Sequence, residues 1–349
     1  MNILYIDTRM GATSTKLLGA LIDVMEKPDQ FIYILNQIGI KGISVHRLDD
    51  ALNGITGTRL EVRHVSATET DPYADEIDDD GKKHEHISHT HRTLADVIKI
   101  INSLSVDEDV KEQAIRVYEN IADAISVSNG LDKRSMKLGG TGSRDIIVSI
   151  VGVCMAVKEL NPEKIIVSTV SVGDGYTHTP RGRMPVPTPE LQALLGDAPY
   201  TSGPERGELC TLCGAALISE LADEYNNMPE MAIKKSGAGF GRRTFKSGVN
   251  CIRVYMGKAL YTIANAEYVE LTAQVYDKDK EAIIALSAKL GEMGIVSAHM
   301  LPIYDINGND GFIIKVLVED DKADDVATYI LENANADRVM RALMKAYTK

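Results

Sequence analysis

Aromatic residues are scarce in this sequence, which contains no tryptophan and only 4 phenylalanines among its 349 residues. Hydrophobic cores must therefore be built mostly from aliphatic side chains and methionine, and the chain is long enough for two or three domains. The 4 cysteines are too few for a disulfide framework. No apolar run approaches the ~20 residues that cross a bilayer, and nothing at the N-terminus resembles a signal peptide. We expect a cytoplasmic protein without membrane contact.

An excess of basic residues is also missing. Acidic residues outnumber basic ones by 50 to 38, and the formal net charge at pH 7 is −12. General nucleic-acid binding requires a basic face that neutralises phosphates, so this balance argues against it. A small anionic ligand held by a local cluster of arginines remains compatible with the composition.

The hydrophobic periodicity predicts an α+β protein in two parts. Residues 1–257 are predicted to be mixed α/β, with a strand over 2–7, a helix over 14–25 and a helical hairpin over 93–127. Residues 266–349 show the order strand, helix, strand, strand, helix, which is typical of a small ferredoxin-like module, and a last helix is predicted near 336–347. We expect the boundary between the two parts at 258–266.

The segment Val172–Ala216 is dense in glycine and proline, which interrupt regular elements. Three alternating prolines between 185 and 189 favour an extended backbone. A loop of this length is uncommon unless it forms a binding surface, and the alternative is a structural connection between subdomains. The polar side chains that surround the prolines are His178, Arg181, Arg183 and Glu208.

Two other segments carry features of an anion or cation site. Residues 234–246 are predicted to form a glycine-rich loop, where Arg242 and Arg243 could hold a phosphate or carboxylate. A β-turn or bulge is the commoner cause of such a pattern. Asp7 ends the first predicted strand just before a glycine and a helix, so it is placed to meet a cation. An ordinary strand–helix pair at the edge of a sheet is the alternative for these residues.

An acidic segment rich in histidine, residues 66–91, is predicted to be a flexible loop. Imidazole is a good ligand for nickel, zinc, copper and cobalt, so this loop suggests weak, exchangeable metal binding. An inert solvated linker is the alternative. Half of the 8 histidines of the chain lie here, namely His84, His86, His89 and His91.

Cys210 and Cys213 form a Cys-x-x-Cys pair at the end of the glycine- and proline-rich segment. Such a pair can bind a soft metal or cycle as a dithiol. The alternative is that both are small buried residues at the beginning of a helix. A single pair without a second one does not decide between these interpretations.

Several segments together resemble a known family, the LarC-type nickel-insertion proteins. The matching segments are YIDTRMGATSTKLLGALID, HRTLADVIKII, GSRDIIVSIVG, HTPRGRMPVPTPELQALL, GELCTLCGAAL and GAGFGRRTFKSGVNCIRV. The resemblance implies a lyase-type enzyme that inserts Ni²⁺ into pyridinium-3,5-bisthiocarboxylic acid mononucleotide, the precursor of the nickel-pincer cofactor of lactate racemase. It also implies that the reaction is driven by CTP with Mn²⁺ or Mg²⁺.

The resemblance further implies roles for individual residues and for partners. Ni²⁺ would be collected by the four histidines of the acidic loop and by the two cysteines, and the partners would be the precursor, a lactate racemase-type apoenzyme and further copies of this chain. The insertion cleft would contain Asp7, His178, Arg183 and Glu208 as catalytic residues and Arg181, Arg242 and Arg243 as contacts to the mononucleotide.

Some polar positions depart from the pattern of the family. Lys137 to Gly140 stand where a histidine and a glutamate are usual, and the opening Gly-x-x-Gly-Asp-Met pattern has become Gly11 to Lys16, without its acid. Two further interpretations therefore remain open. The protein is either a nickel or zinc carrier without insertion chemistry, or a regulatory paralogue that associates with an active insertion protein.

Overall fold

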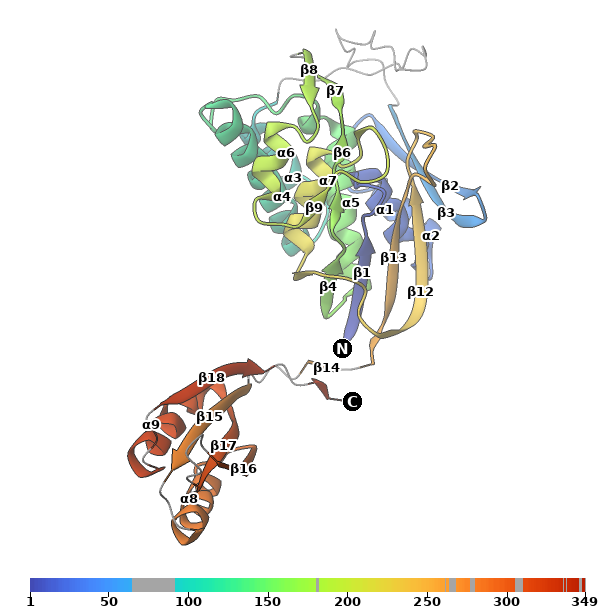
Figure 1. Cartoon of the computed structure of the whole chain (residues 1–349). Coiled ribbons are helices and arrows are strands. Elements are labelled where there is room, and N and C mark those ends of the chain that lie inside the picture. Colours follow the sequence, from blue (N-terminus) through green and yellow to red (C-terminus); the bar gives the residue numbers. More distant parts are fainter. Residues whose placement is uncertain are drawn as a thin grey trace. The chain divides into compact units, whose positions relative to one another are not determined.

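The computed structural model describes residues 1–64, 92–179, 182–260, 262–263, 268–276, 280–304, 310–334, 336, 338–344 and 347–348. The chain divides into two compact units, Met1–Ala259 and Leu260–Lys349, which are coloured blue to orange and orange to red in Figure 1. Each unit has its own hydrophobic core. Within the described residues, no helix is long and apolar enough to span a membrane.

A mixed sheet of 7 strands forms the framework of the first unit. Its interior strand β1 (Asn2–Asp7) is parallel to β4 (Lys164–Val167) and antiparallel to β13 (Cys251–Ala259). The order across the sheet is β11-β4-β1-β13-β12-β3-β2. The other strands are β11 (Glu224–Tyr225), β12 (Met231–Phe240), β3 (Ile55–His64) and β2 (Ile43–Leu52).

Alternation along β1 separates the two faces of the sheet, since successive side chains of a strand point to opposite sides. Leu4 and Ile6 belong to the main core, which the helices of this unit share, whereas Ile3 and Tyr5 belong to a small separate cluster on the other face. The helices therefore cover one face of the sheet. They are α1 (Ser14–Asp23), α2 (Pro28–Leu35), α3 (Leu94–Asn102), α4 (Glu108–Asn129), α5 (Arg144–Leu160), α6 (Pro189–Leu195) and α7 (Leu212–Leu221).

Threonine residues mark where several of these helices begin. Thr13, Thr93, Thr188 and Thr211 each accept a hydrogen bond from a backbone N–H in the first turn of the following helix. A hydroxyl at this position satisfies one of the N–H groups that have no partner within the helix. The long helix α4 ends at Gly130, whose φ of 63° lies in the left-handed region that glycine adopts without strain.

The glycine-rich segment 234–246 is a strand as far as Phe240, so the predicted loop is wrong there. Gly239 packs against helix α1, and a Cβ atom at this position would lie 1.8 Å from the carbonyl oxygen of Lys16. A Cβ atom at Gly237 would lie 2.7 Å from the carbonyl oxygen of Ala20. These glycines allow a helix to approach the sheet closely, which is a packing reason rather than a ligand-binding one.

The segment Val172–Ala216 is also more regular than a long loop. It contains α6, the beginning of α7 and several short strands, which pair locally instead of joining the large sheet. These strands are β6 (Gly173–Asp174), β7 (Tyr176–Thr179), β8 (Gly182–Pro185), β9 (Tyr200–Thr201) and β10 (Gly207–Glu208). The sequence did not predict these elements, because they are short and the prolines interrupt the hydrophobic periodicity from which they would be recognised.

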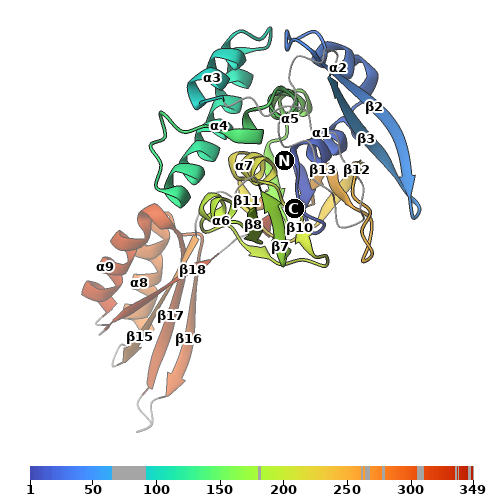
Figure 2. The same cartoon turned by 90° about the horizontal axis from the view of Figure 1, so that it is seen from above.

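The second unit has an antiparallel sheet in the order β16-β17-β15-β18. Figure 2 shows α8 (Lys280–Glu292) and α9 (Ala323–Ala334) on one face of this sheet. The helix expected near 336–347 is wrong, because this apolar run pairs with β15 as a strand. The strands are β15 (Tyr268–Tyr276), β16 (Ser297–Tyr304), β17 (Asp310–Glu319) and β18 (Val339–Met344).

Candidate functional site

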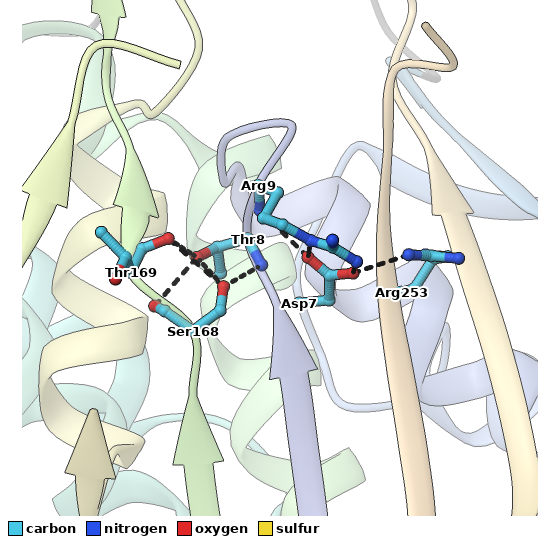
Figure 3. Close-up of polar contacts among 6 residues, drawn as sticks. All are labelled: Asp7, Thr8, Arg9, Ser168, Thr169 and Arg253. Carbon is cyan, nitrogen blue, oxygen red and sulfur yellow. Dashed lines mark hydrogen bonds and ion pairs between the residues drawn. The ribbon is translucent and has the colours of Figure 1, made fainter. Parts of the chain in front are cut away.

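Polar side chains gather where the parallel strands β1 and β4 end. Asp7 is the last residue of β1, and Ser168 and Thr169 follow β4 directly. The backbone N–H of Thr8 donates to Ser168 Oγ at 2.9 Å, and Thr8 Oγ1 donates to the carbonyl oxygen of Thr169 at 3.2 Å (Figure 3). The carboxyl ends of parallel strands are the usual place for ligand sites in such sheets, and these bonds hold the two strand ends together there.

Asp7 lies between two guanidinium groups, as Figure 3 shows. Arg9 Nε donates to Asp7 Oδ1 at 2.9 Å and Arg9 Nη2 to Oδ2 at 2.7 Å, while Arg253 Nη2 donates to Oδ2 at 2.8 Å. Burial of the carboxyl opposes its ionisation, but the hydrogen bonds from both arginines outweigh this effect and lower the pKa of Asp7. The structure thus fills the cation position predicted beside Asp7 with two arginines, which the sequence reasoning missed. We call Asp7, Arg9 and Arg253 the Asp7 group.

A cavity of about 490 Å³ opens beside the Asp7 group. This volume lies within the range of small-molecule sites, roughly 300–1,000 Å³. Ser171 also contributes to its wall, and the remaining lining is apolar or contains sulfur, from Met10, Ile55, Pro204, Val249 and Cys251. Charged donors on one part of the wall and an apolar surface on the rest are typical of small-molecule sites.

Glu208 is held on strand β10, which pairs with β6. Its side chain is half-buried, and burial raises the pKa of its carboxyl to about 7, against the opposing charge of Arg243. A carboxyl with this pKa can accept a proton and release it again near neutral pH. The Arg243 guanidinium donates to the backbone carbonyl oxygens of Glu208 at 3.1 Å and Arg206 at 3.5 Å, so it braces the strand.

Lys16 is a buried cation for which the sequence carried no clear signal. Its side chain on helix α1 is 2% exposed, and Nζ donates to the carbonyl oxygen of Met10 at 2.9 Å and to Asn250 Oδ1 at 3.0 Å. Burial lowers the pKa of Lys16 to about 8, although the neighbouring Cys210 and Cys251 thiols act in the opposite direction. The lysine thereby ties the segment after β1 to the residue that precedes β13.

The hairpin of β7 and β8 carries two other predicted site residues. His178 pairs with Arg183 across the hairpin, and both side chains are exposed. The Arg183 guanidinium lies 4.1 Å from the centre of the Tyr176 ring, a cation–π contact. No hydrogen bond or ion pair between described residues joins this hairpin to Asp7 or Glu208. Arg181 lies outside the described residues, and Arg242 is exposed.

Comparison with known proteins decides the family. The family model described as nickel insertion protein matches residues 4–337. The chain belongs to the nickel insertion protein family. Two relatives are named pyridinium-3,5-bisthiocarboxylic acid mononucleotide nickel insertion protein. The one from Thermotoga sp. (strain RQ2) is 27% identical over 337 residues, which cover 96% of this chain and 81% of the relative. The one from Clostridium kluyveri is 28% identical over 340 residues, covering 96% and 82%.

Cys210 and Cys213 are both buried and free of disulfides. Burial raises the pKa of each thiol to about 12, so both are protonated at neutral pH, whereas metal ions bind the thiolate. Thr211 caps helix α7 between them. This arrangement favours the interpretation of two small core residues at the beginning of a helix.

The other predicted metal ligands are histidines of the acidic segment 66–91. His84, His86, His89 and His91 lie outside the described residues. Among the residues that the structure describes, no three or more histidine, cysteine, aspartate or glutamate side chains are grouped so that they could hold a metal ion.

Proposed function

We propose that this protein inserts Ni²⁺ into pyridinium-3,5-bisthiocarboxylic acid mononucleotide, the molecule for which its relatives are named. The observation that carries this proposal is the match of the nickel insertion family over residues 4–337, which includes most of both units. The product would be the nickel-pincer nucleotide of a lactate racemase-type enzyme. That apoenzyme and further copies of this chain are the partners we propose.

Glu208 is our candidate for the proton transfer that this insertion requires. Ni²⁺ bonds to two sulfur atoms and to a ring carbon, and the hydrogen on that carbon leaves as a proton. A carboxylate with a pKa of about 7 is suited to take this proton. It is partly ionised at neutral pH, and it is a stronger base than a carboxylate with the ordinary, lower pKa. The half-buried position also limits competition from water.

The second unit is our candidate for nucleotide binding. Its order strand, helix, strand, strand, helix, strand and its antiparallel sheet support a ferredoxin-like arrangement. We propose that CTP with Mn²⁺ or Mg²⁺ binds to this unit and drives insertion in the first unit, which makes the protein a lyase-type enzyme. His84, His86, His89 and His91 are the side chains we propose for collecting Ni²⁺.

The test is an insertion assay with the purified full chain, the precursor, Ni²⁺, CTP and Mg²⁺, in which the product is detected by its ability to activate apo-lactate racemase. We expect the wild type to form product, and we expect Glu208→Gln to lower the rate of product formation by a factor of about 100 or more. Glu112→Gln, which changes an exposed carboxylate on α4, is the matched control and should leave the rate unchanged.

Other outcomes separate the alternatives. Nickel binding that is lost when the four histidines become alanine, together with an absence of product, would identify a carrier. No binding of nickel or CTP would exclude the insertion function and direct the search to a protein partner.

A further inference from the structure

The Asp7 carboxylate is fully occupied by the two arginines beside it (Figure 3). Its oxygens accept hydrogen bonds from the Arg9 backbone N–H at 3.2 Å, from Arg9 Nε and Nη2, and from Arg253 Nη2. The side chain is 5% exposed, and the pKa of its carboxyl is lowered. Asp7 therefore remains ionised at neutral pH and orients both guanidiniums, instead of accepting a proton from a substrate.

Both guanidinium groups have N–H donors that are not used in the hydrogen bonds to Asp7. Among the described residues, Arg9 Nη1 and the Nε and Nη1 atoms of Arg253 have no hydrogen-bond acceptor. The side chains are 69% and 38% exposed, so an incoming molecule can reach them. Two cations and one anion leave a net positive charge, and the shared carboxylate fixes the two forks before a ligand arrives.

The cavity of about 490 Å³ is bounded by these donors. Ser171 adds a hydroxyl to the same wall, while Ile55, Pro204 and Val249 provide an apolar surface. A molecule with a strongly anionic end and a flat ring matches both parts. A phosphate monoester is such an anion, because its oxygens accept paired N–H donors from planar guanidinium groups.

We propose that Arg9 and Arg253 bind the phosphate monoester of the mononucleotide substrate, and that Asp7 is the residue that positions them. This inference rests on the proposed function, since it names how the substrate is recognised. It places the phosphate at the Asp7 group rather than at Arg242 and Arg243, because Arg243 already donates to backbone carbonyl oxygens.

Calorimetric titration of the full chain tests this assignment without nickel or CTP. The probes are nicotinic acid mononucleotide, nicotinic acid riboside, which lacks the phosphate, and inorganic phosphate. We expect the mononucleotide to bind at least about tenfold more tightly than either of the others. Arg9→Gln and Arg253→Gln should each weaken mononucleotide binding at least about tenfold and leave riboside binding unchanged.

Arg63→Gln is the matched control, because Arg63 is an exposed arginine of β3 that pairs with Glu61. It should bind the mononucleotide as the wild type does. Thermal unfolding of each variant shows whether the fold is retained, and Arg9→Lys should bind with intermediate affinity, since it keeps the charge but loses the fork.

The inference would be overturned by equal affinity of the wild type for mononucleotide and riboside, by wild-type affinity in both arginine variants, or by equal losses of mononucleotide and riboside binding in these variants. Inorganic phosphate that binds as tightly as the mononucleotide would also overturn it, because free phosphate would then be the ligand. Phosphate-dependent binding that follows the two arginines, combined with no product in the insertion assay, would support this site and remove only the proposed function.

Discussion

Two charged side chains of the first unit, the half-buried Glu208 and the buried Lys16, are both shifted by burial towards their neutral forms. Removal from water disfavours a charge, so burial raises the pKa of the carboxyl to about 7 and lowers that of the ammonium to about 8. Each group therefore makes the free energy of unfolding depend on pH in its own window.

Replacement of Glu208 by glutamine should remove one such dependence. The folded-state pKa of about 7 lies above the ordinary value of 4.5, so the wild-type carboxyl stabilises the fold fully below pH 4.5 and loses this contribution as the pH rises through 7. We expect Glu208→Gln to gain about 1–3 kcal/mol in free energy of unfolding relative to the wild type between about pH 5 and pH 8. Urea unfolding at a series of pH values measures it, and a constant difference would contradict the assigned burial.

Replacement of Lys16 by methionine should show the opposite trend. The folded-state pKa of about 8 lies below the ordinary 10.5, so the wild type gains stability as the pH rises from 8 to 10.5. The difference in free energy of unfolding between wild type and Lys16→Met should therefore move in favour of the wild type over this window, by about 3 kcal/mol in full. A difference that is independent of pH would show that Lys16 is solvated.

At the scale of elements, the first unit depends on the close packing of helix α1 on strand β12. Gly239 brings the two backbones together, and there is no space for a larger residue there. This contact also places Lys16, on the same helix, against the segment that follows β1. The glycine of the strand and the buried lysine of the helix are parts of one packing arrangement.

Gly239→Ala should therefore be strongly destabilising. Its Cβ atom would overlap the Lys16 carbonyl oxygen, so helix and strand must separate, at a cost of about 3 kcal/mol or more in free energy of unfolding. Gly248→Ala is the control, because its Cβ atom would meet only the Met10 side chain, at an ordinary 3.5 Å. That variant should stay within about 0.5 kcal/mol of the wild type in chemical unfolding. Similar losses in both variants would exclude the packing explanation.

At the scale of the whole molecule, the chain forms two units with separate cores. A unit that buries its own apolar surface can fold without its neighbour. Residues 1–259 contain the complete 7-stranded sheet, the Asp7 group and Glu208.

We expect a fragment of residues 1–259 to fold by itself and to unfold cooperatively. We expect the full chain to unfold in urea in two transitions, one for each unit. The midpoint of the fragment, followed by circular dichroism, should match the midpoint of one of them. Because the fragment contains the Asp7 group, it should also bind nicotinic acid mononucleotide. A fragment without cooperative unfolding would show that the second unit is needed to complete the core.

Local signals in the sequence determined much of the fold. Helices α3 and α4 follow from apolar spacing, and β1 follows from a short apolar run that ends at Asp7. These features depend on residues a few positions apart, and intrinsic backbone and side-chain preferences act over that distance. Asp7 and Glu208 could be selected as polar residues next to such elements.

Only the tertiary structure decided which of these residues act together. Arg253 reaches Asp7 across 246 positions of the chain, and Lys16 reaches Asn250 across 234. The glycines of β12 had the composition of a loop, yet they lie in a strand because a helix packs on them. Burial and pairing over such distances depend on which strands become neighbours in the sheet. The sequence therefore determined the elements and the family pattern, whereas the packing of distant segments produced the Asp7 group, its cavity and the shifted pKa values.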